Sequence, residues 1–255
     1  MVRIAVGLGA TCAALMVLGA GQASAACSNA SLKGTYGVQT SGQSGSGTPV
    51  AGLYLLKADG AGKITGTAMQ NKGSGAVSKT VTATYKVTAA CTGTIQSTGD
   101  TLDFVLDNAN TAFQIIDAAS GDGPQAGAGF LQGTVPCNVS ALTGTFGGAG
   151  TIPPSSPGGK LSAIVAQTTY NGKGSATGAG VLNNSGTILT TKSTATYTVT
   201  PACFVSATVK TTVSSGASVV ATTTTHNAGL VVANGNQLLT ISTDSGSAST
   251  GRAQK

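Results

Sequence analysis

The side chains that could perform chemistry are few in this sequence, and the acidic ones gather in one stretch. Seven of the 255 residues are acidic, and five of these lie between residues 100 and 122. The candidates for calcium among them are Asp103, Asp107, Asp117 and Asp122. Such carboxylates, together with carbonyl oxygens from glycine turns, could bind Ca²⁺, which prefers oxygen ligands. However, the strand pattern places Asp103 and Asp107 on an outer face, and the spacing matches neither the EF-hand nor the RTX calcium loop. We therefore predict no metal site.

His226 is the only histidine of the chain. A Ser/His/Asp site needs a base that a carboxylate holds beside a nucleophile on a rigid turn. Asp244 is the one carboxylate that the second half of the chain offers, and no Gly-x-Ser-x-Gly motif is present. We interpret His226 as a solvent-facing strand residue and predict no catalytic residue.

A glycine-rich segment, residues 60–66, has some similarity to a nucleotide-binding loop. Its spacing differs from the dinucleotide fingerprint, and no β-α-β pattern surrounds it. We interpret this segment as a hairpin turn, and we predict neither a cofactor nor a nucleic-acid partner.

Cysteines mark a repeat that covers most of the chain. The pattern of residues 27–37, which is Cys followed by Leu, Gly, Thr, an aromatic residue and Gly, recurs at identical spacing in residues 137–147. Residues 82–91 recur as residues 194–203, and both of these segments end on a cysteine. Repetition at a nearly fixed offset indicates two copies of one structural unit.

We place the two copies at residues 26–136 and residues 137–255. Each copy then contains two cysteines and should be crosslinked within itself. The predicted disulfides are Cys27–Cys91 and Cys137–Cys203. Zinc is a disfavoured use of these cysteines, because the sequence has no Cys-x-x-Cys pair and a single histidine.

The beginning of the chain predicts export. Arg3 precedes a short apolar run at residues 4–21, and residues 23–25 fit the small-residue cleavage pattern. We predict a signal peptide at residues 1–25. A transmembrane anchor and a lipoprotein modified at Cys27 are disfavoured alternatives. No later segment has the length of a membrane-spanning helix, so we predict an exported chain that is periplasmic, extracellular or at the cell surface, where disulfides persist.

Composition and patterning predict an all-β fold. Charged residues make up 8% of the chain, and Thr, Ser, Ala, Val and Gly dominate, which favours short strands and tight turns. Several runs alternate between apolar and polar residues, as half-buried strands do. The first copy contains eight such runs: residues 34–40, 50–57, 63–70, 78–88, 91–97, 101–107, 111–117 and 127–135.

We predict two tandem domains, each an eight-stranded antiparallel up-and-down barrel, because closure removes exposed strand edges. A two-sheet sandwich is the alternative. The second copy is longer within residues 205–225, which predicts lengthened strands or an extra hairpin there. The aromatic residues at matching positions are interpreted as core fillers: Tyr36, Tyr85, Phe146 and Tyr197.

Three motifs of the first copy resemble a known group of proteins. They are Leu-x-Gly-Thr-Tyr at residues 32–36, Asp-Gly-x-Gly-x-x-Thr-Gly at residues 59–66, and Thr-Tyr-x-Val-x-x-x-Cys-x-Gly-Thr at residues 84–94. The chain resembles a group of exported bacterial proteins of unknown function. The eight-run layout is similar in architecture to allene-oxide-cyclase-like and calycin-like barrels. The resemblance transfers no functional residue, and the second copy departs from it where Asn171 replaces Asp59.

The favoured function is a non-enzymatic exported β protein that serves as a surface, matrix or binding module. A duplicated, crosslinked and sparsely charged scaffold without an assembled catalytic set supports this hypothesis. The alternative is a barrel that binds or isomerises a small apolar ligand in its interior. An adhesin that uses its Thr-rich strand edges is a third hypothesis. The predicted partner is therefore a small apolar ligand or a cell-surface component. A hollow apolar barrel would favour the second hypothesis, whereas a filled barrel would contradict it.

Overall fold

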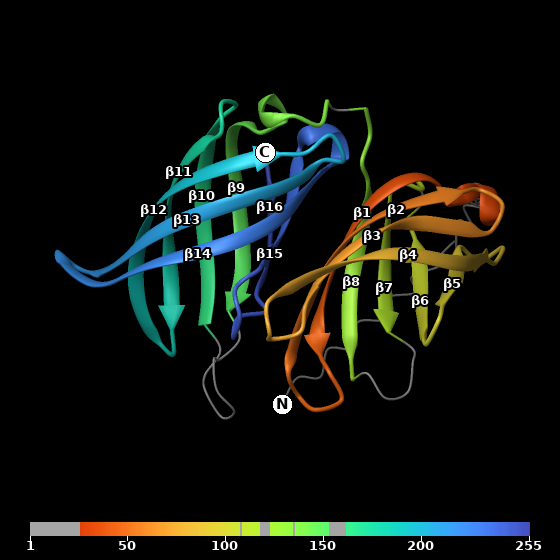
Figure 1. Ribbon diagram of the computed structural model, residues 1–255, viewed down its shortest axis with the longest axis horizontal. Coiled ribbons are helices and arrows are strands. Elements are labelled where there is room, and N and C mark those ends of the chain that lie inside the picture. The colour runs from red at the N-terminus through yellow and green to blue at the C-terminus, as the bar shows by residue number, and fades with distance from the viewer. Residues whose placement is uncertain (1–25, 108, 118–122, 135, 153–161) are drawn as a thin grey trace, which may run out of the picture.

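The chain forms two closed β-barrels that stand side by side (Figure 1). The computed structural model describes residues 26–107, 109–117, 123–134, 136–152 and 162–255. The prediction of two tandem eight-stranded antiparallel barrels is confirmed, and the sandwich alternative is wrong. The predicted signal peptide, residues 1–25, lies outside the described residues. Within the described ranges, no helix is both long and apolar enough to cross a membrane.

The first barrel is built from eight strands, and each predicted run overlaps one of them. The strands are β1 (Lys33–Gln43), β2 (Pro49–Asp59), β3 (Lys63–Asn71), β4 (Ala76–Val87), β5 (Thr92–Ser97), β6 (Asp100–Leu106), β7 (Ala112–Asp117) and β8 (Gln125–Leu131). Strand β1 pairs with both β2 and β8, which closes the sheet. Closure leaves no edge strand that could pair with another chain.

The second barrel repeats this order with two longer strands. Its strands are β9 (Thr143–Ile152), β10 (Ser162–Asn171), β11 (Ser175–Asn184), β12 (Thr187–Val199), β13 (Phe204–Ser215), β14 (Ser218–Val232), β15 (Gln237–Ser242) and β16 (Thr250–Gln254). Strand β9 pairs with β10 and β16. Strands β13 and β14 contain 12 and 15 residues, against 6 and 7 in β5 and β6. The predicted lengthening is thus present, and the β13–β14 hairpin projects from the barrel (Figure 1).

The glycine-rich segment is the turn between β2 and β3. The Asp59 Oδ1 atom accepts hydrogen bonds from the N–H groups of Ala61 (2.7 Å) and Lys63 (3.0 Å). In the second barrel, Asn171 Oδ1 accepts the equivalent bond from the N–H of Lys173 (2.8 Å). An amide oxygen can therefore replace the carboxylate, because the turn requires an acceptor and not a charge.

A short 3₁₀ helix closes one end of each barrel, and a tyrosine holds it. These helices are η1 (Asn29–Ser31) and η2 (Val139–Ala141). The Tyr85 hydroxyl donates a hydrogen bond to the carbonyl of Leu32, just after η1 (2.8 Å). The Tyr197 hydroxyl donates to the carbonyl of Leu142, just after η2 (3.0 Å). These two matching tyrosines therefore fix the barrel ends as well as filling the core.

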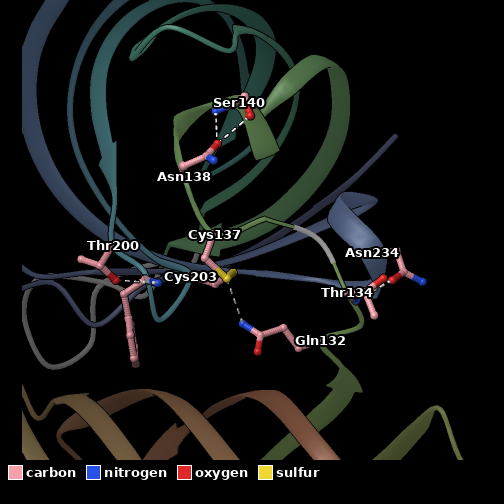
Figure 2. The surroundings of a disulfide bond; sticks show 9 residues. Gln132, Thr134, Cys137, Asn138, Ser140, Thr200, Cys203 and Asn234 are labelled. Atoms are coloured by element: carbon pink, nitrogen blue, oxygen red, sulfur yellow. Dashed lines mark hydrogen bonds between the residues drawn. A yellow bond between two sulfur atoms is a disulfide. The ribbon is translucent and has the colours of Figure 1, made fainter.

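Each closed end also carries a disulfide, which joins the segment before the helix to the loop after the matching tyrosine. The structure joins Cys27 to Cys91 in the first barrel and Cys137 to Cys203 in the second. Figure 2 shows the second disulfide beside Asn138, whose side-chain oxygen accepts a hydrogen bond from the N–H of Ser140 (3.0 Å) and caps η2. The closure is therefore one assembly of helix, tyrosine and disulfide, and it is repeated in both barrels.

The two barrels are packed against each other through an apolar contact. Strands β1 and β2 of the first barrel face β14, β15 and β16 of the second. The buried members of this contact are Ala51, Leu53, Phe130, Ala228, Leu230, Val232, Leu239, Ile241 and Ala248. Burying such residues on the outer faces of two barrels stabilises their association through the hydrophobic effect.

Polar side chains connect the barrels around this apolar contact. Gln39 Nε2 donates hydrogen bonds to the carbonyls of Thr240 (2.7 Å) and Gly251 (2.9 Å). The side chain of Asn234, in η3 (Ala233–Gly235), accepts a hydrogen bond from the N–H of Thr134 in the connecting segment (3.0 Å; Figure 2). The two barrels are therefore joined at several points in addition to the chain connection.

Candidate ligand-binding cavity

The interior of the first barrel is filled by large side chains. Its core cluster contains Leu32, Tyr36, Val38, Ile64, Tyr85, Ile95, Phe104, Phe113 and Ile115, among others. The Phe113 ring packs edge-on against the rings of Tyr36 (5.4 Å between centroids) and Phe104 (5.9 Å). This filled interior contradicts a ligand-binding role for the first barrel.

The second barrel contains a cavity of about 520 Å³ that opens to solvent. All eight strands contribute to its wall, mostly with small apolar or hydroxyl-bearing side chains. These include Ala166, Thr168, Thr191, Ser193, Ala195, Ala207, Val209, Thr211, Thr225 and Thr240. An eight-stranded barrel has room for one small ligand when its interior side chains are small. The second barrel therefore meets the condition of a hollow interior.

Strand registers identify the substitutions that create this space. In the first barrel, Tyr54 of β2 lies opposite Val38 of β1. At the equivalent place in the second barrel, Ala166 lies opposite Gly148. An aromatic ring and a branched side chain are thus replaced by a methyl group and a hydrogen atom. This pair of changes opens one side of the barrel interior.

The opposite side of the interior changes in the same direction. In the first barrel, Phe104 of β6 lies opposite Ile115 of β7. In the second barrel the equivalent pair is Gly229 and Thr240. Because protein interiors are otherwise packed to the density of organic crystals, the loss of these side chains leaves a cavity.

Three aromatic rings form the floor of the cavity beside η2. The Tyr170 ring lies edge-on between the rings of Phe146 (5.3 Å) and Tyr197 (5.4 Å). All three residues line the cavity. Phe146 and Tyr197 are buried, in agreement with the prediction of core fillers, and they also have a second role as cavity lining. Tyr170 is not recognisable from the repeat, because its equivalent in the first barrel is Ala58 and it belongs to no repeated motif.

The Tyr170 hydroxyl lies in an environment that water reaches poorly. Burial raises the pKa of Tyr170 from 10.0 to about 12, and the neighbouring Tyr197 adds to this shift. Among the described residues, none forms a hydrogen bond with this hydroxyl, whereas the Tyr197 hydroxyl is bonded to the end of η2. Tyr170 is therefore the floor residue whose polar group faces the cavity without a protein partner in the described chain.

The pH dependence of Tyr170 gives a direct measurement of this burial. The folded-state pKa of about 12 lies above the ordinary value of 10.0, so the folded state holds the phenolic proton more tightly than the unfolded state. The resulting stabilisation is fully present below pH 10.0 and is lost as the pH rises toward about 12. Ultraviolet titration of wild type and Tyr170→Phe should differ by one phenol that ionises near pH 12. A difference at the ordinary value would contradict the burial of this ring.

His226 lies outside this cavity and pairs with Asp244, the one carboxylate that the sequence offers as its partner. His226 Nδ1 lies 2.8 Å from Asp244 Oδ1, and the His226 side chain is 57% exposed. The other carboxylate oxygen of Asp244 accepts a hydrogen bond from the N–H of His226 (2.8 Å). The structure thus places His226 on a strand facing solvent. The pair holds the loop between β15 and β16 against β14.

Three of the four acidic residues considered for calcium, Asp103, Asp107 and Asp117, lie outside the cavity lining. Asp103 is exposed on β6, and the Asp107 carboxylate accepts hydrogen bonds from the N–H and hydroxyl groups of Thr111 (both 2.8 Å). Asp117 lies 3.4 Å from the Gln125 amide, and Asp122 is outside the described residues. In the described part of the chain, no three His, Cys, Asp or Glu side chains come together around a possible metal position.

Comparisons with known proteins give little beyond this geometry. No protein-family model matches the chain, and a search of curated proteins finds no significant match. Among solved structures, the isotype 1 transferrin binding protein B from serogroup B Neisseria meningitidis matches with 11% identity and a TM-score of 0.35, over 82% of this chain and 52% of that protein. This chain therefore spans about half the length of that protein.

A second solved structure is a protein of unknown function from the DUF3598 family of Nostoc punctiforme. It matches with 11% identity and a TM-score of 0.24, over 89% of this chain and 98% of that protein. Both scores are too low to carry an inference for this chain. The similarity in architecture to allene-oxide-cyclase-like and calycin-like barrels stays a prediction.

Proposed function

We propose that this protein is an exported binding module whose second barrel holds one small apolar molecule. The observation that carries the proposal is the cavity of about 520 Å³ inside a closed barrel. Ligand sites in proteins have volumes of roughly 300–1,000 Å³ and walls that are mostly apolar with a few polar groups. The two disulfides agree with export to an oxidising compartment.

The chemistry of the wall favours binding over catalysis. Arg252 is the one charged residue on the cavity lining in the described chain, and its guanidinium lies over the Phe130 ring of the first barrel (4.2 Å). The His226–Asp244 pair is not part of the lining. Hydroxyl groups and aliphatic carbons make up most of the wall, so the site offers shape and weak hydrogen bonds to a ligand.

The duplication supports a division of roles between the copies. We propose that residues 26–136 and residues 137–255 are two domains descended from one unit. The first is a filled barrel that acts as a scaffold, and the second is the hollow barrel that binds. The replacement of Tyr54 by Ala166, and of Phe104 by Gly229, at equivalent places motivates this division.

Filling the cavity tests the proposal directly. The double variant Ala166→Tyr/Ala207→Ile gives the second barrel the residues that the first barrel has at Tyr54 and Ile95. We expect wild type to bind the neutral dye N-phenylnaphthylamine with enhanced fluorescence, and the double variant to bind it at least about tenfold more weakly. The added side chains occupy the volume that the dye requires.

The matched control is Ala179→Tyr, which adds the same ring to the exposed outer face of β11. This variant should bind the dye as wild type does. Equal binding by wild type and the double variant would overturn the proposal, because the dye would then occupy another site. Native mass spectrometry of the secreted protein should in addition detect a co-purified small molecule in wild type and not in the double variant.

A further inference from the structure

The floor of the cavity contains one hydroxyl group that the fold itself does not use. The hydroxyl groups of Tyr85 and Tyr197 hold the closing helices η1 and η2 in the two barrels. The Tyr170 hydroxyl is not bonded to a closing helix, and the equivalent position in the first barrel is Ala58, which has no hydroxyl. Its ring is fixed between Phe146 and Tyr197, so the position of its hydroxyl is set before any ligand enters.

A hydroxyl that is partly withdrawn from water and has no protein partner is stabilised when a ligand supplies a hydrogen bond. The Tyr170 side chain is half-buried at the deep end of the cavity, where desolvation raises its pKa. Away from the floor, the wall hydroxyl groups include those of Thr211, which is half-buried, and Thr223, which is exposed, so water can solvate them. A polar group at the leading end of a bound molecule that reaches the floor therefore meets the Tyr170 hydroxyl.

Charge restricts the chemical class of the ligand. Arg252 stacks on Phe130 in the first barrel, and Lys255, whose Nζ lies 5.2 Å from the Phe146 ring centroid, does not belong to the lining. A carboxylate or ammonium group at the floor would thus be buried without a charged partner from the described chain, at a cost of several kcal/mol. The floor suits a neutral polar atom.

We propose that Tyr170 selects the ligand by donating a hydrogen bond to a carbonyl or hydroxyl oxygen at the leading end of a neutral apolar molecule. The small aliphatic and threonine side chains along the strands contact the apolar body, and the aromatic floor contacts the polar end. This inference rests on the proposed function of the second barrel, and it adds the class of ligand and the residue that recognises it.

Two neutral dyes of similar size test the inference. Prodan carries a ketone oxygen that accepts a hydrogen bond, whereas N-phenylnaphthylamine has no carbonyl group. In Tyr170→Phe, which removes a single oxygen atom, we expect prodan to bind about three- to tenfold more weakly, the usual effect of one lost hydrogen bond. Binding of N-phenylnaphthylamine should stay within about twofold of wild type.

The emission of bound prodan provides a readout that a merely structural role would not change. A ketone that accepts a hydrogen bond emits at longer wavelength, so prodan in wild type should emit to the red of prodan in Tyr170→Phe. The control is Tyr54→Phe, which removes a half-buried hydroxyl that accepts a hydrogen bond from Gln70 Nε2 (2.6 Å) in the filled barrel. It should change neither dye's affinity nor the emission of prodan.

The outcomes separate this inference from the proposed function. Binding of both dyes to wild type, with unchanged prodan affinity and emission in Tyr170→Phe, would overturn the role of Tyr170 and leave the cavity as the binding site. Equal weakening of both dyes would also overturn it, since the hydroxyl would then act on the shape of the cavity and not through a hydrogen bond to the ketone. Failure of both dyes to bind wild type would overturn the proposed function itself.

Discussion

Asn71→Ala should lower the free energy of unfolding by about 3 kcal/mol, because it leaves several buried carbonyls without a partner. Asn71 is fully buried. Its side-chain nitrogen donates to the carbonyls of Ser242 (2.9 Å), Asp244 (2.9 Å) and Ser247 (2.6 Å) across the contact between the barrels. Alanine can replace none of these bonds, and the buried site limits replacement by water. Urea unfolding followed by circular dichroism measures the loss.

The second barrel supplies a matched control for this substitution. Asn183 occupies the equivalent place, since it lies opposite Ala163 as Asn71 lies opposite Ala51. Its side-chain oxygen accepts a hydrogen bond from the N–H of Gly186 (2.8 Å), but the residue is exposed. We expect Asn183→Ala to cost less than about 1 kcal/mol. Similar losses in the two variants would show that Asn71 contributes only through its local turn.

The position of Asn71 connects the filled barrel to the cavity of its neighbour. Ser242 and Ser247, whose carbonyls it binds, both line the cavity. The His226–Asp244 pair fixes the same loop from the other side. The first barrel therefore holds one rim of the cavity in place. Under the proposed function, the filled copy thus serves as a support for the copy that binds the ligand.

The sequence predicts the barrel strands well, because strand alternation and turn residues are local signals. The alternation of Ala83, Tyr85 and Val87 with polar residues marks β4, and the Asp59-Gly60 pair marks the turn after β2. The disulfide pairing follows from the duplication and agrees with the pairs that the structure forms. The lengthening of β13 and β14 follows from the extra length of the second copy within residues 205–225.

The contact between barrels was missed because its signal is a break in the alternation. Leu53, Leu55 and Leu56 belong to one apolar run, which places apolar side chains on both faces of β2. A strand that is buried on both faces has such a continuous run of apolar residues. Asn71, in contrast, is of a residue type that is common in turns, and nothing in the sequence distinguishes it from Asn183.

The sequence suggests a hollow barrel only as an alternative and does not assign it to either copy, because the cavity depends on differences between the copies, whereas the repeat draws attention to their similarities. The replacement of Tyr54 by Ala166 is visible in the sequence once the strands are aligned. That this replacement opens a cavity becomes clear only when both residues are known to point into a barrel and the opposing side chains are known to be smaller as well. A comparison of side-chain volumes at inward-facing positions is the signal that would have found it.

Removal of the Cys137–Cys203 disulfide, by Cys137→Ala and Cys203→Ala together, should have the largest effect on stability. The disulfide joins residues 66 positions apart, and the chain-entropy model for a loop of this size predicts a loss of about 4 kcal/mol in the free energy of unfolding. Cys203 is fully buried and belongs to the same cluster as Phe146 and Tyr197. The double variant should therefore also loosen the floor of the cavity.

The equivalent double variant of the first barrel, Cys27→Ala/Cys91→Ala, separates these two effects. Its cysteines lie 64 positions apart, so urea unfolding should show nearly the same loss of stability, about 4 kcal/mol. Binding of N-phenylnaphthylamine, measured where circular dichroism shows both variants folded, should weaken in the Cys137/Cys203 variant alone. Equal weakening in both would mean that the cavity responds to overall stability and not to its own floor. A selective effect would place the binding site at the closed end of the second barrel, where Tyr170 lies.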